Sequence, residues 1–230
     1  MGSFIQLTSA DGFHFPAYVA RPEGAPRGAL VVLQEIFGVN SHIQSVADRW
    51  AARGYLVVAP ATFSRIEQDV DLGYTGDDMK KGIDLKARTE ALPGVGVLPD
   101  LQAAIDYAAK ESGGKKVGIF GFCWGGLLTW RAACELNGLS AAVAYYGGGV
   151  TTEKEIARTP RVPVLAHFGD RDAHISQDSV KAFAAAHPHV QVQVYAADHG
   201  FNCDQRGAYD AAAAKTADER TQVFFEQYVG

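Results

Sequence analysis

The chain has 230 residues, with 21 lysine and arginine residues against 26 aspartate and glutamate residues and a formal net charge of −5. The basic residues are scattered, which argues against the clustered positive charge that nucleic-acid-binding proteins use to hold phosphates, and we expect no nucleic-acid partner. With 47% apolar and 20% charged residues the composition is typical of a soluble globular protein, and the length suits one α/β domain over residues 1–230.

No apolar run approaches the roughly 18 residues that a membrane-spanning helix needs. The first residues also lack a charged segment followed by an apolar core, so we expect a cytoplasmic protein with no membrane partner. The three cysteines, Cys123, Cys134 and Cys203, form no C-x-x-C pair. We therefore expect neither a disulfide framework nor a metal site. We also expect no cofactor, and the protein could be a monomer or a small homo-oligomer.

The predicted elements begin with a β-hairpin over residues 4–22, whose turn lies at Asp11 and Gly12. Apolar runs rich in valine and alanine then alternate with helical patterns. Such near-continuous runs are typical of strands in a parallel sheet that is covered on both faces, whereas an alternating run suits an edge strand. The apolar runs cover residues 28–35, 55–60, 116–121, 141–147 and 162–169, and the alternating run covers residues 190–195.

Helices are predicted between these strands. The helical patterns cover residues 41–54, with Ser41 as N-cap and Gly54 as stop, and residues 98–114, 126–138, 176–187 and 211–229. The alternation of strands and helices predicts a mostly parallel, doubly wound sheet with helices on both faces. Residues 62–97 break the pattern, and we interpret them as an insertion with some helix over the carboxyl edge of the sheet, where such sheets bind ligands.

The stretch Gly121-Phe122-Cys123-Trp124-Gly125 has the form G-x-nucleophile-x-G and joins a predicted strand to a predicted helix. In a nucleophile elbow the central residue occupies such a strained turn, and the free N–H groups of the helix favour a thiolate there and can stabilise an oxyanion. A buried cysteine of the core is the competing interpretation. The surrounding strand and helix, and the residues that follow, favour the elbow.

An acid and a histidine follow the elbow in the chain order that this arrangement requires. Asp170 and Asp172 both lie after the strand that ends at residue 169, and we favour Asp172, with Asp170 as the alternative. His199 follows the last predicted strand and precedes a glycine, which suits a histidine displayed on a loop. The sequence therefore predicts a cysteine nucleophile with His199 as its general base.

The chain resembles the dienelactone hydrolase family of α/β-hydrolases over nearly its whole length. The residues that carry the resemblance are "QEIFGVN" at 34–40, "APATF" at 59–63, "GFCWGG" at 121–126, "YYG" at 145–147, "GDRD" at 169–172 and "DHGF" at 198–201. The resemblance implies an α/β-hydrolase fold and a cofactor-free, carboxymethylenebutenolidase-like hydrolase of small lactones or esters. It also implies a Cys123, Asp172 and His199 triad that works through an acyl-enzyme.

The resemblance implies further roles as well. In this family the glutamate at the position of Glu35 contacts the resting thiol and helps convert it to a thiolate when substrate binds. Family elbows imply oxyanion donors at the backbone N–H groups of Ile36 and Trp124. The residues expected to bind substrate are Phe37, Lys81, Tyr145 and Arg206.

Two other functions remain open. An activated cysteine is also a redox site, and Cys203 could resolve an oxidised Cys123 if the two lie together. A non-catalytic relative that binds ligands with the same fold is the second alternative, because fold alone does not determine function.

Overall fold

The computed structural model describes residues 1–94 and 96–230. Its centre is an eight-stranded sheet in the order β1-β2-β4-β3-β5-β6-β7-β8. The antiparallel hairpin of β1 and β2 joins antiparallel to β4, and all remaining pairs are parallel. The strands are β1 (Ser3–Thr8), β2 (His14–Ala20), β3 (Gly28–Leu33), β4 (Tyr55–Pro60), β5 (Val117–Phe122), β6 (Leu139–Tyr145), β7 (Val164–Gly169) and β8 (Gln191–Tyr195).

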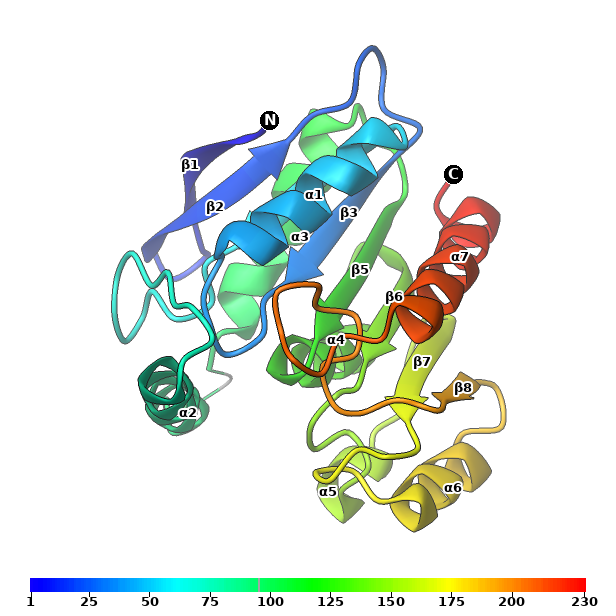
Figure 1. Ribbon diagram of the computed structural model, residues 1–230. Coiled ribbons are helices and arrows are strands. Elements are labelled where there is room, and N and C mark those ends of the chain that lie inside the picture. Colours follow the sequence, from blue (N-terminus) through cyan, green and yellow to red (C-terminus); the bar gives the residue numbers. More distant parts are fainter. Residues whose placement is uncertain (95) are drawn as a thin grey trace.

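Helices cover both faces of this sheet, as Figure 1 shows. The apolar residues of α1 (Ser41–Ala52) and α7 (Ala211–Tyr228) join one buried cluster. Those of α3 (Leu98–Glu111), α4 (Trp124–Glu135) and α6 (Gln177–Ala186) join the cluster on the other face. The doubly wound sheet predicted from the alternating runs is thereby confirmed, and β8, the alternating run, is an edge strand.

Element boundaries differ from the prediction in ways that bear on function. β3 ends at Leu33, so Glu35 lies in the loop beyond the strand, and α4 begins at Trp124, two residues earlier than its pattern suggested. The N-cap of α1 is Asn40 rather than Ser41, because the Asn40 side chain accepts the N–H of Ile43 at 3.3 Å. A short helix, α5 (Glu153–Ile156), was not predicted because four residues show no period.

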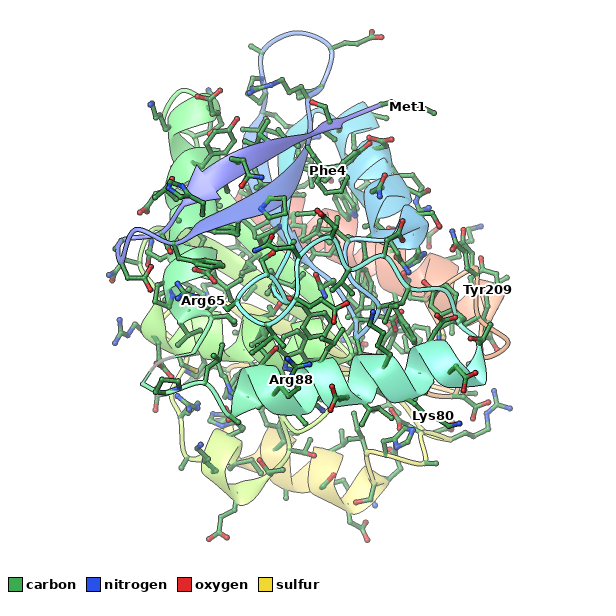
Figure 2. All side chains as sticks on the ribbon, turned by 90° about the vertical axis from the view of Figure 1, so that its left-hand side faces the viewer. Met1, Phe4, Arg65, Lys80, Arg88 and Tyr209 are labelled. Carbon is green, nitrogen blue, oxygen red and sulfur yellow. The ribbon has the colours of Figure 1, made fainter. Side chains whose placement is uncertain are left out.

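The expected insertion contains one substantial helix, α2 (Gly76–Glu90), and its residue 95 lies outside the described residues. Thr75 and Asp78 begin α2 with a reciprocal capping box. In Figure 2 the helix lies across one side of the molecule, with the exposed side chains of Lys80 and Arg88 along it. Figure 1 places it at the end of the sheet towards which β3 and β5 point, which is the carboxyl edge, as predicted.

The segment before α2 is attached to the loop that follows β3. Leu72 donates its N–H to the carbonyl of Phe37 at 2.9 Å, and Gly38 forms an isolated bridge with Asp71. Gly38 has φ +84°, and a Cβ there would lie 1.9 Å from the carbonyl oxygen of Val70, so only glycine fits. Among the helices of the described residues, none is long and apolar enough to cross a membrane.

Candidate active site

Cys123 occupies a strained turn between β5 and α4. Its φ of 54° and ψ of −115° lie in a region that L-residues other than glycine rarely adopt, and it caps the N-terminus of α4. The flanking glycines allow this turn: a Cβ on Gly121 would lie 2.4 Å from the carbonyl oxygen of Gly125. A Cβ on Gly125 would lie 2.4 Å from the carbonyl oxygen of Gln34. The half-buried Cys123 is therefore presented at the head of a helix, against the end of β3.

Asp172 and His199 come together from two separate loops. His199 Nδ1 lies 2.7 Å from Asp172 Oδ2, and Oδ1 of Asp172 accepts the backbone N–H groups of His174 and Ile175 at 2.7 and 3.2 Å. The Asp172 side chain is fully buried. The alternative, Asp170, is half exposed and faces Arg171 at 4.0 Å. The geometry therefore selects Asp172 as the acid that orients the imidazole.

The electrostatics of this pair favour a charged ring. Burial works against protonation of His199, but its hydrogen bond with Asp172 and the nearby Cys123 side chain outweigh burial and raise the pKa of the ring to about 10. Burial similarly opposes ionisation of Asp172, yet its hydrogen bond from His199 leaves the pKa of the carboxyl below its usual value. Asp172 is thus a carboxylate that can stabilise an imidazolium beside the sulfur of Cys123.

Glu35 and Arg206 form a second buried pair. Glu35 is only 2% exposed, and its Oε1 accepts from Arg206 Nη1 at 2.8 Å. Within the described residues, its Oε2 has no hydrogen-bond partner. The Arg206 guanidinium lies 5.6 Å from the ring centre of Phe37 and packs on Gly200, where a Cβ would lie 2.5 Å from Nη1. Gly200 has φ +86°, so the residue after His199 has both the conformation and the space that only glycine supplies.

The backbone N–H groups of Ile36 and Trp124 belong to adjacent segments, because the elbow backbone at Gly125 rests on the carbonyls of Leu33 and Gln34. In the described part of the chain, neither N–H donates a backbone hydrogen bond. Two N–H groups without a backbone acceptor, on segments that meet at the elbow, suit the oxyanion donors that the sequence predicts. The Trp124 side chain is fully buried; it stacks on Phe63 with ring centres 4.9 Å apart, and its Nε1 donates to Glu90 at 2.8 Å.

Two of the residues expected to bind substrate make other contacts in the structure. Tyr145 is the last residue of β6, and its hydroxyl lies 2.6 Å from Thr221 Oγ1 of α7, so its side chain belongs to the core. Lys81 forms an ion pair with Glu67 at 2.6 Å, about half exposed. The next residue, Tyr146, leaves the extended backbone of β6 with a φ of 36° and takes the position beside His199 that was expected of Tyr145.

Tyr146 and His174 were missed by sequence reasoning. The ring centre of Tyr146 lies 5.2 Å from that of His199, and its buried hydroxyl has no partner in the described residues. Its φ of 36° marks a second strained position next to the elbow. The exposed His174 has its ring centre 5.1 Å from that of His199. The paired tyrosines of "YYG" were a signal for Tyr146, but His174 had none.

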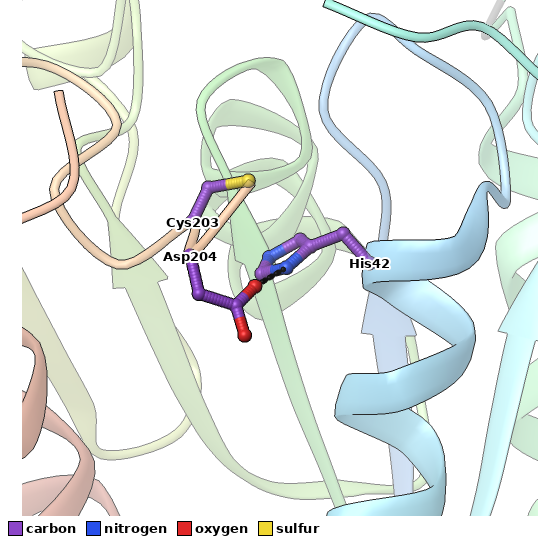
Figure 3. A group of neighbouring side chains, drawn as sticks. All are labelled: His42, Cys203 and Asp204. Atoms are coloured by element: carbon purple, nitrogen blue, oxygen red, sulfur yellow. Dashed lines mark hydrogen bonds and ion pairs between the residues drawn. The ribbon is translucent and has the colours of Figure 1, made fainter. Parts of the chain in front are cut away.

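One group of side chains in the described residues has the composition of a metal site: His42, Cys203 and Asp204, whose donor atoms lie within 4.8 Å of one another (Figure 3). These atoms are already engaged within the protein. His42 Nδ1 lies 3.0 Å from Asp204 Oδ1, and the Cys203 thiol donates to the Tyr74 hydroxyl at 3.3 Å. Burial raises the pKa of Cys203 to about 11, which disfavours the thiolate that would bind a metal. The contact between His42 and Asp204 therefore joins α1 to the loop that carries Arg206.

Comparisons with known proteins identify the family of this chain. The sequence profile of the dienelactone hydrolase family matches residues 15–229. The chain is 36% identical over 247 residues to the "Putative carboxymethylenebutenolidase" of Escherichia coli strain K12, covering 100% of this chain and 88% of that one. It is 34% identical over 225 residues to the carboxymethylenebutenolidase of Pseudomonas putida, covering 94% and 92%.

A crystal structure from Klebsiella pneumoniae, described as a "Putative Dienelactone Hydrolase", superposes with a TM-score of 0.85 at 33% identity and covers 99% of both chains. The family profile and these relatives match nearly the whole chain, a range that spans the elbow, the loop after β3 and the loops that carry Asp172 and His199 in this protein. The chain therefore belongs to the dienelactone hydrolase family, and is a hydrolase with the α/β-hydrolase fold.

Proposed function

We propose that this hydrolase cleaves small lactones or esters through an acyl-enzyme on Cys123. The observation that carries the proposal is the 2.7 Å contact between His199 and the buried Asp172. The nearby Cys123 side chain also raises the pKa of the His199 ring. A cysteine at a strained helix head with a charged imidazole beside it has the properties of a nucleophile.

The reaction follows from these groups. The Cys123 thiolate attacks the carbonyl carbon, and the carbonyl oxygen becomes an oxyanion between the N–H groups of Ile36 and Trp124. His199 then protonates the leaving alkoxide, which in a lactone stays attached to the acyl group. The neutral imidazole next takes a proton from water, the resulting hydroxide attacks the thioester, and Cys123 leaves as a thiolate. Asp172 holds the ring in the productive orientation throughout.

The position of Arg206 favours a substrate that carries a carboxylate. It is 16% exposed and lies beside the buried Glu35, whereas Lys81 is occupied by Glu67 at the surface. A guanidinium binds a carboxylate with a planar pair of donors, which lysine lacks. A substrate carboxylate that took Arg206 from Glu35 would free that glutamate to accept the thiol proton, in keeping with the role implied by the family.

The test compares hydrolysis of an aryl acetate and of a dienelactone by wild type, Cys123→Ala and Cys134→Ala. Cys134 is the matched control because it is a buried thiol on the same helix, with its pKa raised to about 12 by burial. Loss of turnover in Cys123→Ala alone is expected, and undiminished turnover would refute the assignment. If Arg206 binds the carboxylate of the dienelactone, the KM for this substrate should rise more in Arg206→Gln than in Lys81→Gln. The reverse order would assign the carboxylate to Lys81.

Oxidation chemistry has less support. Cys203 is fully buried, is engaged with Tyr74, and has a pKa near 11, so it is a poor partner for an oxidised Cys123. Mass spectrometry after mild peroxide treatment distinguishes the two functions, because a redox enzyme of this kind would accumulate a Cys123 to Cys203 bridge.

A further inference from the structure

Helix α2 touches both segments that carry the oxyanion donors. Its residue Gly82 rests on the loop after β3, where a Cβ would lie 2.4 Å from the carbonyl oxygen of Ile36. Its last residue, Glu90, accepts from Trp124 Nε1 at 2.8 Å. One helix from the insertion therefore contacts Ile36 at its middle and Trp124 at its end.

Glu90 is itself held in place from the other side. Arg131 Nη1 contacts both carboxylate oxygens of Glu90, at 3.0 and 2.9 Å, and Arg131 Nε contacts the buried Glu155 at 2.9 Å. Oε1 of Glu90 thus receives both Arg131 and the Trp124 indole, which stacks on Phe63. The indole has little freedom to rotate, and its backbone N–H lies next to Cys123.

We infer that α2 is a brace that sets the separation of the two oxyanion donors, with Gly82 positioning Ile36 and Glu90 positioning Trp124. Neither residue touches the reacting atoms in this scheme. The inference rests on the proposed function, since it assigns a role to donors that only an acyl-transfer mechanism uses. It also gives the insertion a role, because α2 would fix the position of the loop after β3 relative to the elbow.

The distinguishing measurement compares an ester with its thionoester, in which sulfur replaces the carbonyl oxygen. Sulfur is a weak hydrogen-bond acceptor, so well-placed oxyanion donors favour the oxygen ester. The ratio of kcat/KM for ester over thionoester therefore reports donor placement. A variant that is only partly folded loses both rates equally and keeps the ratio of the wild type.

Glu90→Met removes the carboxylate that accepts from the Trp124 indole, while Arg131 keeps its ion pair with Glu155. Loss of a whole oxyanion donor costs about 100- to 1,000-fold in kcat, so a displaced donor should cost about tenfold, with the ester-to-thionoester ratio falling by a similar factor and KM nearly unchanged. Glu90→Gln keeps an oxygen at the position of Oε1 and should retain most of the wild-type ratio. Asp84→Asn, on the same helix and exposed beside Arg88, is the control that should retain it fully.

Gly82→Ala tests the other arm of the brace. Gly82 is buried, and the methyl group of alanine would overlap the Ile36 carbonyl oxygen, so the loop after β3 would have to shift. The ester-to-thionoester ratio should fall in this variant whatever the change in thermal stability, because partial unfolding lowers both rates equally. If Glu90→Met and Gly82→Ala keep the wild-type ratio, the brace is refuted while the Cys123 mechanism stands. If Cys123→Ala retains turnover, the proposed function itself fails.

Discussion

Removal of the arginine partner from Glu35 should leave an isolated charge inside the protein. In Arg206→Met the Glu35 carboxylate, 2% exposed with one oxygen already unpartnered among the described residues, loses its 2.8 Å ion pair. Breaking a buried pair by removing one partner costs about 3–5 kcal/mol, because the remaining charge is neither solvated nor compensated. Arg206 is 16% exposed, so solvent screens the pair only partly, and we expect the lower half of that range.

Urea unfolding of wild type and Arg206→Met should show this loss as a lower free energy of unfolding in the variant.

Two further variants complete this test. Glu35→Gln combined with Arg206→Met removes both charges, so the double variant should be more stable than Arg206→Met alone. Arg88→Met, which breaks an exposed pair with Asp84, is the control and should change stability little. Additive losses in the double variant would refute the account of Glu35 as a buried, compensated charge.

Three other variants have defined outcomes. Asp172→Asn should lower kcat by about 100- to 10,000-fold, because His199 loses the partner that orients and charges it. The stability that wild type has over His199→Gln should be present below pH ~6.5 and disappear as the pH rises towards about 10, since the folded-state pKa of this ring is raised; a gap that widened in alkali would contradict that pKa. Gly125→Ala should destabilise the protein by about 1–3 kcal/mol and lower activity, because its methyl group overlaps two backbone carbonyls. Gly207→Ala, where a Cβ meets nothing within 4 Å, is its matched control in thermal unfolding.

The order of elements and the positions of Cys123, Asp172 and His199 were predictable because each depends on a local pattern. Apolar runs identify the parallel strands, and the residues that follow a strand's carboxyl end collect at one edge of the sheet. A glycine on either side of a cysteine at a strand-to-helix junction is a requirement of backbone space, which the sequence states directly. These features need no knowledge of distant contacts.

The partners of charged and aromatic side chains were decided by the tertiary structure. Whether Tyr145 or Tyr146 faces His199 depends on how the chain leaves β6, and the φ of 36° at Tyr146 is a conformation that strand alternation does not predict. Arg206 pairs with Glu35 across 171 residues, and Glu90 meets Trp124 across 34. No local pattern encodes such pairs, because the chain contains many cationic and acceptor side chains and only the packing of distant segments decides which of them meet. The sequence by itself determined the sheet and the place of Cys123 at a strand-to-helix turn, and the folded chain determined which side chains surround that turn.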